Sequence, residues 1–137
     1  MSDADPLFLT LAEVLEIHAD QLRLFGGSEG IRDQGALESA IATPEATFAG
    51  AFLHETLWEM AAAYAFHIAQ NQPFLDGNKR VGLNACLLFL ALNGWEVNDP
   101  TGALYDAMIA FAEGTLEKTG LADILRSLAI PLDSLEP

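Results

Sequence analysis

Apolar residues recur at three- and four-residue steps near the start of the chain. They lie on one face of a helix that would run from about Leu9 to Phe25, at Leu11, Val14, Leu15, Ile17, Leu22 and Leu24. Thr10 precedes the segment and Glu13 stands three residues later, which is the pattern of a capping box. A Gly-Gly pair after Phe25 ends the pattern. The sequence therefore predicts a capped amphipathic helix here.

Similar patterns predict further helices along the rest of the chain. They are expected at about Gln34–Ala42, Leu53–Gln70, Val81–Asn93, Thr101–Ala112 and Leu121–Ala129. The segment Leu53–Gln70 is small and apolar around Met60–Phe66, and Val81–Asn93 is apolar nearly all round, which is typical of central, buried helices. The fold class is thus predicted as all-α, a compact bundle of about six helices.

The remaining segments carry no helical period. Residues 43–52 are interpreted as an ordered loop or flap, and the tail from Pro131 to Pro137 as frayed. No convincing strand pair is predicted, although Trp95–Asn98 could form one arm of a small hairpin.

Composition narrows the functional classes. The chain has 137 residues, of which 51% are hydrophobic, and a net charge of -14. This predicts a single domain over 1–137, with an ordered core from about residue 7 to residue 130. The charge repels phosphate backbones and anionic lipid, so neither direct nucleic-acid binding nor a membrane role is expected. Cys86 is the only cysteine, and the first residues lack the pattern of a signal peptide, which favours a cytoplasmic protein.

The segment Asn71–Arg80 is a dense polar insertion between the two most apolar helices. Asp76-Gly77-Asn78 is good start chemistry for the helix that runs on through Val81. This earlier start places Lys79 and Arg80 in the first turn, where the helix dipole disfavours cations. A bound phosphate would reverse that effect, because it accepts from free N–H groups and attracts both cations. Asp76 could hold Mg²⁺ beside such a phosphate. The alternative is that Asp76 caps the helix while Lys79 and Arg80 pair with carboxylates.

The stretch QPFLDGNKRVGL resembles the signature of the Fic/Doc family, in which His-Pro-Phe-x-Asp-Gly-Asn is followed by Lys-Arg or Gly-Arg. The segments FLTLAEVLEIHADQLRLFGG, GIRDQGALESAIATPEATF and FLALNGWEV also resemble the Doc-type pattern. The resemblance implies a helical fold with the signature loop between two central helices. It also implies transfer of part of ATP, with Mg²⁺, to a protein hydroxyl.

The Doc branch implies a toxin that phosphorylates elongation factor Tu and blocks translation, restrained in trans by a cognate antitoxin. The AMP-transferring Fic branch carries Gly-Arg and a further arginine where this chain has Lys79 and Leu83, so AMP transfer is the disfavoured alternative. No self-inhibitory motif is found around Glu29-Gly30 or Glu113-Gly114, because Phe25 and Ile109 stand where Ser or Thr is required.

The family's site residues carry over by position. Asp76 would coordinate Mg²⁺, while Asn78 and the backbone of Gly77 would hold phosphate oxygens. Lys79 and Arg80 would neutralise charge during transfer, and Phe74 would pack inward and anchor the loop. The segment Ala46–Phe52 would correspond to the family's flap, which guides the target near the nucleotide.

Gln72 departs from the family pattern, because the family's catalytic histidine stands at this position. A neutral amide cannot act as a useful base, and loss of a general base usually removes about 10²–10⁴-fold of rate. The chain is therefore predicted to be inactive or attenuated, either through an introduced change or through natural divergence. His67, His18 and His54 are interpreted as structural, and Cys86, Trp58 and Trp95 as packing residues.

Two other functional hypotheses remain. One is a non-catalytic protein that binds a nucleotide and a partner through the same loop. The other is an acidic helical interaction module that binds no nucleotide.

Overall fold

The computed structural model describes residues 5–135. It contains six α-helices: α1 Leu11–Phe25, α2 Gln34–Ala42, α3 Leu57–Asn71, α4 Asn78–Leu92, α5 Ala103–Ala112 and α6 Lys118–Leu128. Two short 3-10 helices, η1 Thr43–Glu45 and η2 Leu132–Leu135, follow α2 and close the described chain. The predicted all-α class is confirmed.

Side-chain caps explain where the first three helices begin. In α1, Thr10 Oγ1 accepts from the N–H of Glu13 at 3.1 Å, while Glu13 accepts from the N–H of Thr10 at 2.8 Å. At the start of α2 the Asp33 carboxylate accepts from the N–H of Ala36, and at the start of α3 Thr56 Oγ1 accepts from the N–H of Glu59. Each cap satisfies a backbone donor that the helix leaves free, which fixes the start of the helix.

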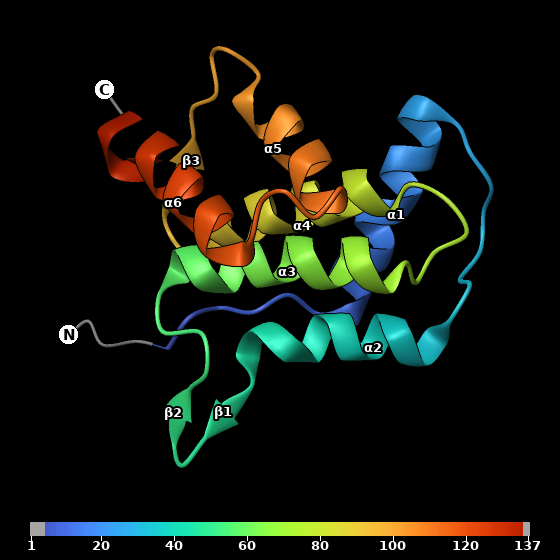
Figure 1. The fold of residues 1–137 in the computed structure, drawn as a ribbon, viewed down its shortest axis with the longest axis horizontal. Coiled ribbons are helices and arrows are strands. Elements are labelled where there is room, and N and C mark those ends of the chain that lie inside the picture. The colour runs from blue at the N-terminus through green and yellow to red at the C-terminus, as the bar shows by residue number, and fades with distance from the viewer. Residues whose placement is uncertain (1–4, 136–137) are drawn as a thin grey trace.

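Helices α3 and α4 form the antiparallel centre of the molecule (Figure 1). Their backbones approach closely at Gly82, where an added Cβ would lie 3.0 Å from the carbonyl oxygen of Ala65. Helix α2 and η1 pack on α3, and α1 packs on α4. The core between them includes Tyr64, Phe74 and Phe89, each almost fully buried.

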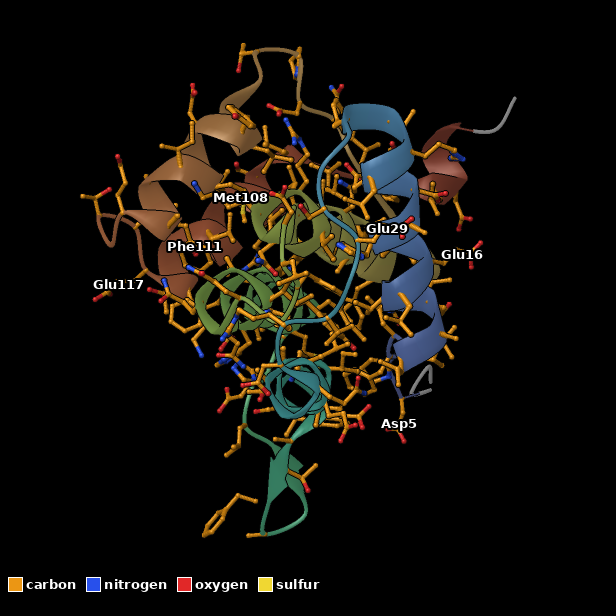
Figure 2. All side chains as sticks on the ribbon, turned by 90° about the vertical axis from the view of Figure 1, so that its right-hand side faces the viewer. Asp5, Glu16, Glu29, Met108, Phe111 and Glu117 are labelled. Carbon is orange, nitrogen blue, oxygen red and sulfur yellow. The ribbon has the colours of Figure 1, made fainter. Side chains whose placement is uncertain are left out.

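Helices α5 and α6 cover the other side of the central pair (Figure 1). Met108 and Phe111 point from α5 toward the interior, and both are 2% exposed (Figure 2). Asp5, Glu16 and Glu117 point outward, consistent with their exposure (Figure 2). The polar and apolar positions of the sequence thus separate between surface and core.

Two small antiparallel sheets correct the prediction that no strands pair. Strands β1 Thr47–Phe48 and β2 Ala51–Phe52 form a hairpin, and β3 Trp95–Val97 pairs with β4 Ala129–Pro131. The second pair joins segments more than thirty residues apart, so no local pattern could reveal it. It also orders part of the tail that was predicted to fray, while residues 136–137 lie outside the described chain.

Within residues 5–135, no helix combines the length and the apolar character needed to cross a membrane.

Candidate active site at the α3–α4 loop

The loop between α3 and α4 begins and ends with left-handed residues. Gln72 is the C-cap of α3, with φ 47° and ψ 56°, and Gly77 is the N-cap of α4, with φ 81°. Gly77 suits this conformation because it has no Cβ, whereas Gln72 must be held in it by its neighbours. The polar insertion predicted from the sequence is therefore a tight, defined turn.

Phe74 and Asn78 hold the loop from within. The Phe74 side chain is 1% exposed, which confirms that it packs inward. Asn78 Oδ1 accepts from the N–H of Phe74, and Asn78 Nδ2 donates to its carbonyl oxygen, both at 3.0 Å. Both ends of the Asn78 amide are thus engaged by the loop backbone, and its role toward phosphate stays a prediction.

Asp76 lies exposed between the loop and the end of α1. Its Oδ1 accepts from the N–H of Gly77 at 3.0 Å, and its Oδ2 accepts from the N–H of Ser28 at 3.3 Å. The carboxylate does not cap α4, because the N-cap Gly77 offers no side chain and none replaces it. The alternative interpretation of Asp76 as a helix cap is therefore wrong.

Lys79 and Arg80 occupy the first turn of α4, as predicted, and both are exposed. Neither forms an ion pair with any carboxylate of residues 5–135, where Arg23–Asp20 is the pair observed. The Arg80 guanidinium instead lies 4.3 Å from the centre of the Phe25 ring. The alternative in which these cations pair with carboxylates is thus not realised among the described residues.

Six of the seven predicted site residues line one open pocket of about 380 Å³: Gln72, Asp76, Gly77, Asn78, Lys79 and Arg80. Ala69 and Leu75 add apolar surface, and Tyr105 of α5 completes the wall. Phe74 lies behind the pocket in the core. The site therefore combines an uncapped helix start, two cations and a carboxylate around one cavity, an arrangement that suits a phosphate-bearing ligand.

Three residues that contact the loop or line its pocket were not predicted as part of the site. His18 of α1 stacks on Phe74, and its Nε2 lies 3.1 Å from the carbonyl oxygen of Asp76. Arg32 donates to the carbonyl oxygens at the end of α3, and Tyr105 lines the pocket. Arg32 could have been noticed in the sequence because it is one of only six basic residues in an acidic chain. Its contacts could not be predicted, because its partners lie some forty positions away.

The other two histidines lie away from the loop. Burial lowers the pKa of His67 to about 4, and the nearby Lys118 and His54 add to this effect. Lys118 Nζ lies 3.4 Å from His67 Nε2. Burial also lowers the pKa of His54, whose Nδ1 is buried without a hydrogen-bond partner among the described residues. His67 thus contacts Lys118 and Phe66, which agrees with its structural interpretation.

The remaining structural residues behave as predicted. Cys86 is fully buried, and burial raises the pKa of its thiol to about 12. Trp58 and Trp95 contact each other edge to face, with centroids 5.0 Å apart. Neither tryptophan lines the pocket.

The hairpin β1–β2 does not lie beside the pocket. It projects from the end of α3 opposite the α3–α4 loop (Figure 1). This position follows from chain direction, because α2 begins beside Pro73 and runs away from the loop along α3. The hairpin therefore does not line the pocket in the conformation described, and its correspondence to the flap stays a prediction.

Fold and site together define an all-α protein with a pocket lined by two cations and a carboxylate at the start of the central helix α4. A model described as the Fic/DOC family matches residues 8–90. The chain is 34% identical over 116 residues to Protein kinase doc of Escherichia phage P1, covering 85% of this chain and 90% of that protein. It is 43% identical over 70 residues to Toxin Doc of Mycolicibacterium smegmatis, covering 51% of this chain and 54% of that protein. The chain belongs to the Fic/Doc family and is a Doc-type member of it.

Proposed function

We propose that this chain is a Doc-type toxin whose fold transfers phosphate from ATP to a hydroxyl of elongation factor Tu, and that Gln72 leaves it impaired. The observation that carries the proposal is the pair Lys79 and Arg80 at the uncapped start of α4, without a carboxylate partner among residues 5–135. The names of the two relatives, a protein kinase and a toxin, support the same activity.

The start of α4 supplies the phosphate-binding groups. Free backbone N–H groups of its first turn would donate to phosphate oxygens, and the helix dipole favours the negative charge. Lys79 and Arg80 would neutralise the charge that spreads over the phosphoryl group during transfer. Arg80 is held beside the pocket by its contact with Phe25, which reduces its freedom before the ligand binds.

Asp76 is the residue that would hold Mg²⁺. No group of three or more His, Cys, Asp or Glu side chains suited to a metal occurs among residues 5–135. A single exposed carboxylate at the pocket edge fits an ion whose other ligands are phosphate oxygens and water, as Mg²⁺ prefers. When bound, the ion would neutralise phosphate charge. The bonds from Gly77 and Ser28 orient the carboxylate in advance.

Gln72 is where the chemistry is limited. A histidine at this position would accept the proton of the attacking hydroxyl, while the glutamine amide can only hydrogen-bond to it. The residue is exposed and lines the pocket, so a basic group there would reach a docked hydroxyl. The site keeps its other charged groups and lacks only the base. We therefore propose that the activity is impaired by Gln72.

Phosphate transfer is favoured over AMP transfer by position 83. Leu83, where the AMP-transferring branch carries an arginine, is partly buried and packs against the hydrophobic core. It therefore offers no charge to phosphates in the pocket. AMP transfer is the weaker alternative for this reason.

A cognate antitoxin is the proposed partner, and it would act in the cytoplasm together with the target. The surface supports binding of a basic segment, because twenty acidic residues face six basic ones in this chain.

The second candidate function is a non-catalytic protein that binds a nucleotide and a partner. Gln72 favours it, because the pocket keeps its anion-binding groups while lacking a base. In this case ATP would bind but no phosphate would be transferred, even with a histidine at position 72.

A coupled translation extract tests the toxin function. Added Gln72→His protein with Mg²⁺-ATP should stop protein synthesis, and fresh elongation factor Tu supplied after removal of the Gln72→His protein should restore it. The unsubstituted chain should inhibit at least about 100-fold more slowly, in line with loss of a general base. Inhibition that fresh elongation factor Tu does not relieve would point to another target, and no inhibition by either form would favour the non-catalytic candidate.

A further inference from the structure

Arg32 binds the end of α3 from the loop that precedes α2. Its Nε donates to the carbonyl oxygen of Gln72, and its Nη2 donates to that of Asn71, both at 2.6 Å. The last carbonyls of a helix have no partner within the helix, so these bonds satisfy two exposed acceptors. A guanidinium suits this role because its planar fork presents two donors at once.

The backbone around Arg32 extends the contact. The N–H groups of Arg32 and Asp33 both donate to the carbonyl oxygen of Pro73, at 2.7 Å and 3.1 Å. Three consecutive carbonyls, those of residues 71 to 73, are therefore held by two consecutive residues. We call this set of four bonds the Arg32 clamp.

The clamp acts where the backbone is strained. Gln72 is one of two non-glycine residues with positive φ among those described, and such a conformation persists only when neighbours enforce it. Its own N–H donates to Ile68 at 3.2 Å, a bond that fixes one side of the residue. Arg32 fixes the other side through the Gln72 carbonyl.

The orientation of side chain 72 follows from this conformation. A change of residue 72 from the left-handed to the right-handed region would turn its Cα–Cβ bond and move the side chain out of line with the pocket. Arg32 does not line this pocket and pairs with no carboxylate of residues 5–135. Arg32 would therefore influence the site in two ways, through the backbone of residue 72 and through the charge of its own guanidinium.

We propose that Arg32 is a positioning residue, which holds position 72 in the left-handed conformation that presents its side chain to the pocket. This inference deepens the proposed function and, as far as activity is concerned, rests on it. A base at position 72 must be within hydrogen-bond reach of the attacking hydroxyl, so a small misplacement lowers the rate of transfer more than the affinity for nucleotide.

Kinetics in the Gln72→His background test this role. Arg32→Lys keeps the positive charge but lacks the planar fork that donates to both carbonyl oxygens. Arg32→Gln loses both the charge and the fork. We expect kcat to fall about 10–100-fold for both variants, with KM for ATP changed less than about threefold. Arg126→Gln, at an exposed position of α6, removes the same charge elsewhere and should leave both constants unchanged. Unchanged kcat in both Arg32 variants would overturn the proposal.

A proton titration separates the role of geometry from that of charge. In the Gln72→His protein, Arg32→Gln should raise the pKa of the introduced imidazole, because the neighbouring positive charge no longer opposes protonation. Arg32→Lys should change this pKa much less, although it lowers kcat. A loss of fold stability alone would not lower kcat while leaving the pKa nearly unchanged. An equal pKa in the two variants would contradict an influence of the Arg32 charge on side chain 72.

The unsubstituted chain gives a test that requires neither enzymatic activity nor a substituted protein that must fold. NMR should show the Arg32 Nε–H protected from exchange, with a scalar coupling across the hydrogen bond to the Gln72 carbonyl. The three-bond coupling of residue 72 should report its left-handed φ. An unprotected Nε–H would overturn the clamp, whereas a protected one with no transfer by Gln72→His would retain the clamp and reject the proposed function.

Discussion

The imidazole of His18 lies against the ring of Phe74, with centroids 3.9 Å apart and planes inclined by 11°. His18 is 6% exposed, and its Nε2 lies 3.1 Å from the carbonyl oxygen of Asp76. The contact joins the middle of α1 to the α3–α4 loop. One side chain thus supports both the packed side of the loop and the backbone of the residue proposed to bind Mg²⁺.

Replacing His18 should therefore destabilise the fold and loosen the loop. His18→Ala removes the stacked ring and leaves a cavity beside Phe74, so the free energy of unfolding should fall by about 2–4 kcal/mol. Equilibrium unfolding in urea measures this change. Glu16→Ala, on the exposed face of the same helix (Figure 2), should change it by less than about 0.5 kcal/mol. Equal effects of the two substitutions would show that the stacking contributes nothing.

The first turn of α4 should determine affinity for nucleotide. Lys79→Gln and Arg80→Gln should each weaken Mg²⁺-ATP binding by about 10–100-fold, since each removes charged hydrogen bonds to phosphate. Calorimetric titration of the unsubstituted chain and the two variants measures the change. Arg126→Gln has the same charge change on α6 and should bind normally. Equal binding by all four proteins would place the phosphates elsewhere.

Sequence patterns predicted those parts of the fold that depend on local chemistry. The start of α1 was predicted from Thr10 and Glu13, which form the expected capping box. The charged loop was also visible, because Lys79 and Arg80 oppose the dipole of their own helix. Features that join distant segments were not visible, namely the β3–β4 pair and the contacts of His18 and Arg32 with the loop.

Two glycines should respond to alanine with opposite sign. At Gly82 an added Cβ would lie 3.0 Å from the Ala65 carbonyl oxygen, so α3 and α4 must separate and stability should fall by about 1–3 kcal/mol. At Gly35 in α2 the nearest atom would be 3.5 Å away, so Gly35→Ala should stabilise the helix by about 0.5–1 kcal/mol. Thermal and urea unfolding measure both. A harmless Gly82→Ala would contradict the close approach of the central helices.

Stability should decrease in mild acid because of His67. The folded state lowers the pKa of His67 from 6.5 to about 4, so the unfolded chain binds more protons between these values. The free energy of unfolding should therefore fall as the pH decreases through this range, by about 1–2 kcal/mol after allowance for solvent screening of a half-buried group. Lys118, 3.4 Å away, opposes protonation in the folded state.

The contribution of His67 is separated from that of the carboxylates by comparison with His67→Asn. Unfolding measured from about pH 7 to about pH 5 should show a shallower decline in the variant. Lys118→Met should reduce the decline in part, because burial, the largest cause of the pKa shift, remains. Identical pH profiles for the unsubstituted chain and His67→Asn would show that His67 does not titrate differently on folding.

The intact mass of purified elongation factor Tu, after incubation with Mg²⁺-ATP and either form of the chain, tests the central claim most directly. We predict a mass increase of one phosphate with Gln72→His and little or none with the unsubstituted chain. Lys79→Gln added to Gln72→His should abolish the increase. A mass increase of one AMP would contradict phosphate transfer, and equal modification by both forms would contradict the role of position 72 as the missing base.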